Sequence, residues 1–286
     1  MNTTKHMKAG LLGMAMALAC LAPARAAQDD VVGMVLDVHG AGEIARKGDV
    51  RKLQLLSYLK PGARVTVESG AKVSLSHYGA KLIYLVAGPA TVQVEQDKVT
   101  SVKGAAPTSR SLAEKVVVAA LNPNMGAAAF KMRGPAPDIR LVSPSSQTVL
   151  LGIKPSFMWE PNGKNAYQVT VIEKPERHVA QGTTESAMWT LPEHVALQPG
   201  GQYRWTVSYT PADGKLRSAS SDFSVATEAD ASTMLTMRPL ADAAVDEWVL
   251  YASLLRERNM FEASREVWRA IAAKRPDLAV AQSMAR

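Results

Sequence analysis

Histidine is the residue type that most often binds metals and transfers protons near neutral pH, and four histidines follow the N-terminal segment of this chain. No two of them have the spacing that would place a metal-binding pair on one helix face, and no H-E-x-x-H motif is present. His77, in the stretch SLSHYGAK, is the best candidate for a functional histidine, although a solvated or half-buried side chain is the commoner outcome at such a position. The four are His39, His77, His178 and His194.

Other residue types with catalytic potential lack the surroundings that catalysis needs. The serine clusters SPSSQ and SASSD do not lie in a G-x-S-x-G nucleophile turn. Gly40-x-Gly42 lacks the following helix and the acidic partner of a dinucleotide site. Asp29 and Asp30 are expected in a flexible N-terminal stretch rather than in a catalytic carboxylate pair. We therefore expect a non-enzymatic protein without cofactor or metal.

Residues 1–26 have the features of a cleavable export signal. MNTTKHMK is positively charged, AGLLGMAMALACLA is a short apolar run, and Ala24-Arg25-Ala26 fits an A-x-A cleavage site. Cleavage between Ala26 and Ala27 would deliver the protein to the periplasm or the exterior. The single cysteine, Cys20, lies inside this segment. Membrane association is expected only if Cys20 is lipidated. If cleavage follows Ala26, Cys20 is removed and the processed chain has no thiol.

The charge balance excludes one class of partner. The full chain carries a net charge of +7, and loss of Lys5, Lys8 and Arg25 leaves 30 basic and 26 acidic residues. This small surplus is dispersed and is not accompanied by a basic stripe with stacking aromatic residues, so nucleic-acid binding is not expected.

The rest of the chain divides by its periodicity. Residues 31–103 and 138–227 contain short runs of β-branched and alternating residues bounded by turn signals, which predicts two antiparallel β domains. Residues 104–137 are rich in Gly, Ala, Pro and Ser and are predicted to be a linker, in which 111–121 could be a helix or a strand. Residues 238–286 change to helical periodicity and predict a short C-terminal helical hairpin. The fold class is therefore mainly β.

The stretch VESGAKVSLSHYGAKLIYLVAGPATVQVE, residues 67–95, is expected to form the hairpin core of the first domain. Its three most distinctive polar or aromatic residues, His77, Tyr78 and Tyr84, are candidates for a ligand-recognition face. Its inward-facing residues are expected to be Val73, Leu75, Leu82, Leu85, Val92 and Val94.

Residues 31–103 resemble the FecR-type domain of bacterial envelope proteins. That resemblance implies a non-catalytic antiparallel β domain that binds a ligand or partner. It is carried by Gly33-x-Val35-x-x-Val38, Ile44-x-Arg46-x-Gly48, Leu59-x-x-Gly62, Val65-x-Val67, Val73-x-Leu75, Gly79, Leu82, Leu85-x-x-Gly88 and Val92-x-Val94.

Residues 138–227 are similar to fibronectin type III and immunoglobulin-like domains, which implies a β-sandwich. Trp159 and Trp205 are expected in its core, and an exposed aromatic platform for carbohydrate is the alternative. The resemblance rests on Leu141-x-x-Pro144, Phe157-x-Trp159, Tyr167-x-Val169-x-Val171, Leu197-x-Pro199-Gly200, Tyr203-x-Trp205-x-Val207 and Phe223.

Residues 240–276 resemble one tetratricopeptide-type helical hairpin. The matching elements are Trp248-x-x-Tyr251-Ala252-x-x-Leu255, then Ala263-x-x-x-Val267-x-x-Ala270, and Pro276. About three such repeats are needed for the concave peptide-binding groove of these proteins, so a single hairpin is expected to dock on the preceding domain or on a partner chain.

These observations favour a modular binding or scaffold protein of the bacterial envelope. Its partner would be an envelope protein or a cell-wall or other glycan ligand. The alternative is a periplasmic sensor or regulatory component of a transmembrane signalling system.

Overall fold

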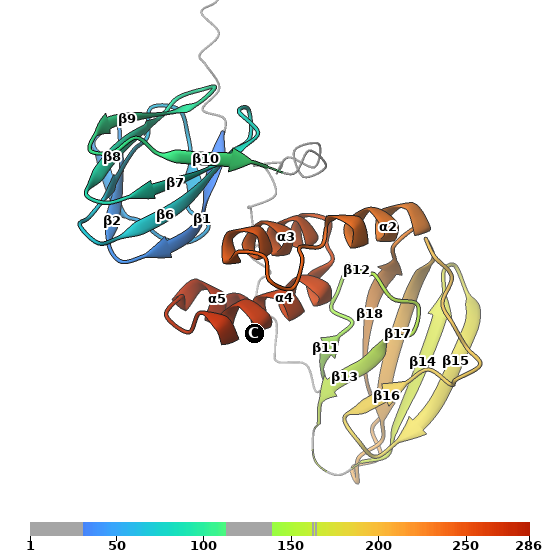
Figure 1. Cartoon of the computed structure of the whole chain (residues 1–286). Coiled ribbons are helices and arrows are strands. Elements are labelled where there is room, and N and C mark those ends of the chain that lie inside the picture. Colours follow the sequence, from blue (N-terminus) through green and yellow to red (C-terminus); the bar gives the residue numbers. More distant parts are fainter. Residues whose placement is uncertain (1–30, 113–138, 162, 164) are drawn as a thin grey trace, which may run out of the picture.

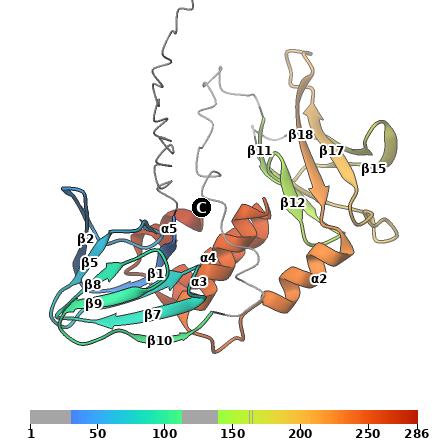
Figure 2. The same cartoon turned by 90° about the horizontal axis from the view of Figure 1, so that it is seen from above.

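The computed structural model describes residues 31–112, 139–161, 163 and 165–286. The predicted export signal with its Ala26–Ala27 cleavage site, and nearly all of 111–121, lie outside these residues. The described chain is mainly β with short helices near its C-terminal end, which confirms the predicted fold class. A helical unit (residues 227–286) lies between an N-terminal β unit (31–112) and a second β unit (139–226), as both views show (Figure 1 and Figure 2).

Two antiparallel five-stranded sheets pack face to face in the N-terminal β unit. Alternation of apolar and polar residues places one face of each sheet in a shared interior. The first sheet contains, in spatial order, β10 (Thr108–Ser111), β7 (Leu82–Ala87), β6 (Lys72–His77), β1 (Gly33–His39) and β4 (Tyr58–Leu59). The second contains β3 (Asp49–Lys52), β2 (Gly42–Arg46), β5 (Arg64–Val67), β8 (Ala90–Val94) and β9 (Val99–Lys103).

The interior of this unit contains most of the predicted inward residues. Val73, Leu75, Val92 and Val94 are buried in it, and Leu82 packs against it. The prediction for Leu85 was wrong, because its side chain is 43% exposed. In β7, Tyr84 and Val86 point inward and Leu85 points outward. This alternation cannot be recognised in the sequence, because all residues of the run LIYLV are apolar.

The N-terminal β unit also extends beyond the predicted boundary at residue 103. Strand β10 lies within the segment predicted as a linker and pairs antiparallel with β7, so that Thr108 faces Leu85 and Ser111 faces Leu82. Its sequence, TSRS, lacks the apolar alternation that identifies strands, because β10 is an edge strand without a buried face.

The second β unit consists of a three-stranded and a five-stranded sheet. Seven strands pair antiparallel, whereas β12 pairs parallel with β18. The smaller sheet contains β11 (Arg140–Ser143), β13 (Ser156–Glu160) and β16 (Met188–Thr190). The larger sheet contains β12 (Thr148–Leu150), β18 (Arg217–Val225), β17 (Gln202–Tyr209), β14 (Tyr167–Glu173) and β15 (Arg177–Thr184).

Aromatic side chains fill the space between these two sheets. Trp159 and Trp205 are 3% and 0% exposed, so they are core residues and do not form an exposed platform. The ring centroids of Phe157 and Trp205 are 5.2 Å apart. The Tyr203 hydroxyl accepts a 2.8 Å hydrogen bond from the backbone N–H of Gln198, which fixes the loop ahead of β17. Gly200 allows the positive φ of 76° that this loop requires.

The helical unit contains α2 (Glu228–Met237), α3 (Val245–Glu257), α4 (Phe261–Lys274) and α5 (Ala279–Met284). The predicted hairpin corresponds to α3 and α4, which join at Asn259, a residue with a positive φ of 58°. Helix α2 was not predicted from the sequence, because EADASTMLTM has almost no apolar stripe and buries fully only Met234. None of the described helices is long and apolar enough to cross a membrane.

A single apolar core joins the helical unit to the N-terminal β unit. Met34 and Leu36 of β1 and Ile83 of β7 point out of their own sheet and are buried against the helices. Strand β1 is therefore covered on both faces, which explains the uninterrupted apolar run VVGMVL. The helical residues fully buried in this core include Val249, Leu250, Ala252, Leu254, Leu255, Trp268 and Ile271.

Candidate binding groove on the helical unit

The three predicted ligand-binding residues do not lie on an exposed surface. The His77 side chain is completely buried and Tyr84 is 8% exposed. The Nδ1 atom of His77 accepts a 3.0 Å hydrogen bond from the Ala80 N–H, so Nε2 carries the proton and donates to the Glu95 carbonyl oxygen at 3.1 Å. His77 thus ties the end of β6 to the end of β8. Ligand binding by this residue stays a prediction that the structure does not test.

Tyr78 lies on the other side of the same strand end. It packs against the core shared with the helical unit, and burial raises the pKa of its hydroxyl above the ordinary value. His77 and Tyr84 therefore belong to the interior of the N-terminal β unit, whereas Tyr78 belongs to the contact with the helices. Within the described ranges, no three His, Cys, Asp or Glu side chains gather as a metal-binding group.

Two arginines connect the helical unit to the N-terminal β unit. Arg275, at the C-terminal end of α4, donates to Oδ1 of Asp37 at 2.7 Å and to the Val38 carbonyl oxygen at 2.9 Å. Arg110 of β10 donates to Asp246 at 2.6 Å and to Glu247 at 2.8 Å, both in the first turn of α3. Charge-assisted hydrogen bonds of this kind fix orientation as well as adding stability.

A carboxylate at the start of α4 connects the helical unit to the second β unit. Oε1 of Glu262 accepts hydrogen bonds from the N–H and the hydroxyl of Ser145, at 2.8 Å and 2.9 Å. Its Oε2 accepts a hydrogen bond from the Thr148 hydroxyl. The Asn259 carbonyl oxygen, in the turn before α4, accepts from the Val149 N–H at 2.8 Å. The helical unit is thus attached to both β units through separate residues.

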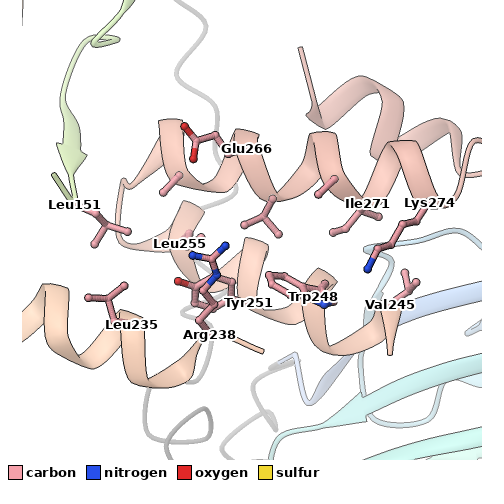
Figure 3. A pocket seen from close by; sticks show the side chains of 13 residues that line it. Leu151, Leu235, Arg238, Val245, Trp248, Tyr251, Leu255, Glu266, Ile271 and Lys274 are labelled. Carbon is pink, nitrogen blue, oxygen red and sulfur yellow. The ribbon is translucent and has the colours of Figure 1, made fainter. Parts of the chain in front are cut away.

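The side of the helical unit that these contacts leave open carries an apolar groove of about 210 Å³ (Figure 3). Helices α2, α3 and α4 form its walls, and Leu151 after β12 closes one end. Its apolar lining residues are Leu151, Leu235, Val245, Trp248, Tyr251, Leu255, Ala263, Val267, Ala270 and Ile271.

Charged residues lie along the rim of the groove. The Arg238 guanidinium carbon is 5.9 Å from the centroid of the Trp248 ring, a cation–π distance. Lys274 and Glu266, both on α4, also line the groove and are exposed. The rings of Trp248 and Tyr251 form a T-shaped pair with their centroids 6.3 Å apart. Burial raises the pKa of the Tyr251 hydroxyl above its ordinary value.

The sequence pointed to these residues for a different reason. Trp248, Tyr251 and Leu255, and likewise Ala263, Val267 and Ala270, carry the tetratricopeptide-like spacing of the predicted hairpin. The structure places all six along the groove as well. Arg238 and Leu235 carried no signal in the sequence, because the helix that precedes the hairpin was not predicted.

No protein-family model and no curated protein matches the chain. Among solved structures, the crystal structure of CopC from Methylosinus trichosporium OB3b is similar to part of it, with 16% sequence identity and a TM-score of 0.26. The similarity covers 32% of this chain and 95% of the other. A similarity at this level supports no statement about function.

Proposed function

We propose that this chain is an exported, non-enzymatic binding or scaffold protein of the bacterial envelope. In this proposal the helical unit holds the two β units in a fixed arrangement and offers its groove to a protein partner. The observation that carries the proposal is the attachment of one helical unit to both β units, with an apolar groove left open beside the joints. The export signal and the FecR-like and fibronectin-like spacings of the sequence support the cellular location and the class.

The size of the groove favours a protein partner over a cofactor. Pockets for drug-sized ligands have volumes of roughly 300–1,000 Å³, and this groove is smaller and lined by three helices. A groove of this kind suits one or two apolar side chains presented by a partner segment.

The test is retention of native partners by the processed chain, residues 27–286, immobilised and exposed to an envelope extract of the source bacterium. Sedimentation with purified cell-wall glycan tests the glycan alternative. We expect one or a few proteins to be retained at micromolar concentration and identified by mass spectrometry. Retention of neither a protein nor a glycan would contradict the proposal.

A further inference from the structure

Two cations at the rim of the groove have no carboxylate partner within the described residues. Arg238 rests against the Trp248 ring, and Lys274 donates a 3.3 Å hydrogen bond to the Ala241 carbonyl oxygen. Other arginines of the same region are paired with acids: Arg275 with Asp37 and Arg258 with Asp230. Arg238 and Lys274 therefore keep their charge available to a carboxylate from outside the chain.

Apolar side chains next to these cations are exposed to solvent. Leu235 of α2 is 61% exposed, and Leu240, in the loop before α3, is 76% exposed, the highest value among the large apolar residues described. Leu240 lines a second hollow of about 540 Å³, also bordered by Arg238 and Tyr251. Exposed apolar residues that flank a hollow are typical of protein-interaction sites.

We propose that the groove binds a protein segment in which an apolar side chain is followed or preceded by an acidic residue. The apolar side chain enters between Trp248 and Ile271, and the carboxylate pairs with Arg238, with Lys274 as the second cation. The face of Trp248 supplies a rigid wall, and Arg238 is already positioned over it, so little side-chain freedom is lost on binding. This inference rests on the proposed binding function and specifies the chemistry of the partner.

The test is selection from a displayed library of random short peptides on the full processed chain, followed by affinity measurements with the enriched peptides. We expect enrichment of an aliphatic or aromatic residue next to Asp or Glu. Arg238→Glu should weaken binding about five- to tenfold, because an attraction becomes a repulsion of similar size. Leu235→Ser should weaken binding as well, and its exposed position leaves the fold intact.

Arg269→Glu is the matched control, since it makes the same charge change on α4 at a residue that does not line the groove. Enrichment of basic or uncharged peptides, no enrichment, or equal weakening by Arg238→Glu and Arg269→Glu would overturn the inference. Concentration-dependent dimerisation that Leu235→Ser abolishes would also overturn it, because the groove would then hold a second copy of the chain. If an envelope protein is retained equally by wild type and Arg238→Glu, the proposed function stands and this inference fails.

Discussion

Arg275, the C-cap residue of α4, donates a 2.7 Å hydrogen bond to Asp37 of β1, which lies 238 positions earlier in the chain. Both side chains are mostly buried, with 11% and 14% exposure. The contact ties the far end of the helical unit to the first strand of the N-terminal β unit. At the opposite end of α4, Glu262 accepts hydrogen bonds from Ser145 of the second β unit. These contacts at its two ends fix the position of α4, and therefore of the groove, between the two β units.

Replacing Arg275 by Met should destabilise the protein by about 2–3 kcal/mol, because the Asp37 carboxylate is left mostly buried without its cation. Urea unfolding followed by tryptophan fluorescence measures the change. A double-mutant cycle with Asp37→Asn should show that the two losses are not additive. Arg269→Met is the control and should change stability by less than about 0.5 kcal/mol. Additive losses in the cycle would refute a direct coupling.

Replacing Glu262 by Ala should loosen α4 from the second β unit. The change removes the acceptor of hydrogen bonds from Ser145 and Thr148, so we expect a loss of about 2 kcal/mol. Amide exchange at Val149, whose N–H bonds to the Asn259 carbonyl oxygen, should become faster. Glu266→Ala, on the same helix but exposed, should leave this exchange rate unchanged.

Glu257 makes stability depend on pH. Desolvation by burial raises the pKa of its carboxyl to about 7, and the adjacent Arg258 opposes this shift only in part. The folded state therefore binds more protons than the unfolded state between the ordinary carboxyl pKa and about 7. This contribution to stability is fully present below the ordinary pKa and is lost as the pH rises through about 7.

Glu257→Gln should accordingly raise the thermal midpoint at about pH 8 and have little effect at about pH 4.5. Because the carboxyl is half exposed, solvent screening limits the gain to about 1 kcal/mol. Thermal scans of both proteins across this pH range provide the measurement. A gain that is the same at every pH would show that the effect does not come from ionisation of Glu257.

His77→Phe should destabilise the N-terminal β unit by about 2 kcal/mol, because the Ala80 N–H and the Glu95 carbonyl oxygen both lose their partner inside the protein. Thermal unfolding followed by circular dichroism measures the loss. His194→Phe, at a residue exposed in the second β unit, is the control. An unchanged midpoint for His77→Phe would argue against this structural role.

Export with cleavage predicts a mature chain that begins at Ala27. Intact-mass measurement of the protein recovered from its native host should match residues 27–286, and Ala26→Asp should block processing because the site requires a small residue. A mass that retains a lipid-modified Cys20 would instead fix the protein to a membrane.

Local patterns along the chain were enough to predict the two β units and the α3–α4 hairpin. Alternating residues in AYQVTVI, hairpin turns such as PADGK, and the helical spacing of Trp248 and Leu255 are local signals, because each arises from neighbours along one strand or helix. Burial of Trp159 and Trp205 followed from the same alternation. Leu85 was assigned to the wrong face, because it lies in a run that is apolar throughout. Strand β10 was not predicted, because it lies at a sheet edge and has no buried face.

The contacts between the units and the groove depend on long-range packing and could not be predicted from local patterns. Arg275 with Asp37 and Glu262 with Ser145 pair residues more than a hundred positions apart, and no local pattern records which charge will meet which. The contact between Arg238 and Trp248 depends on the position of α2 beside α3. Helix α2 could not be predicted from the sequence, because its apolar stripe is too weak. His77 could be identified as an unusual residue from the sequence, but only the fold showed that both of its ring nitrogens are bonded inside the protein.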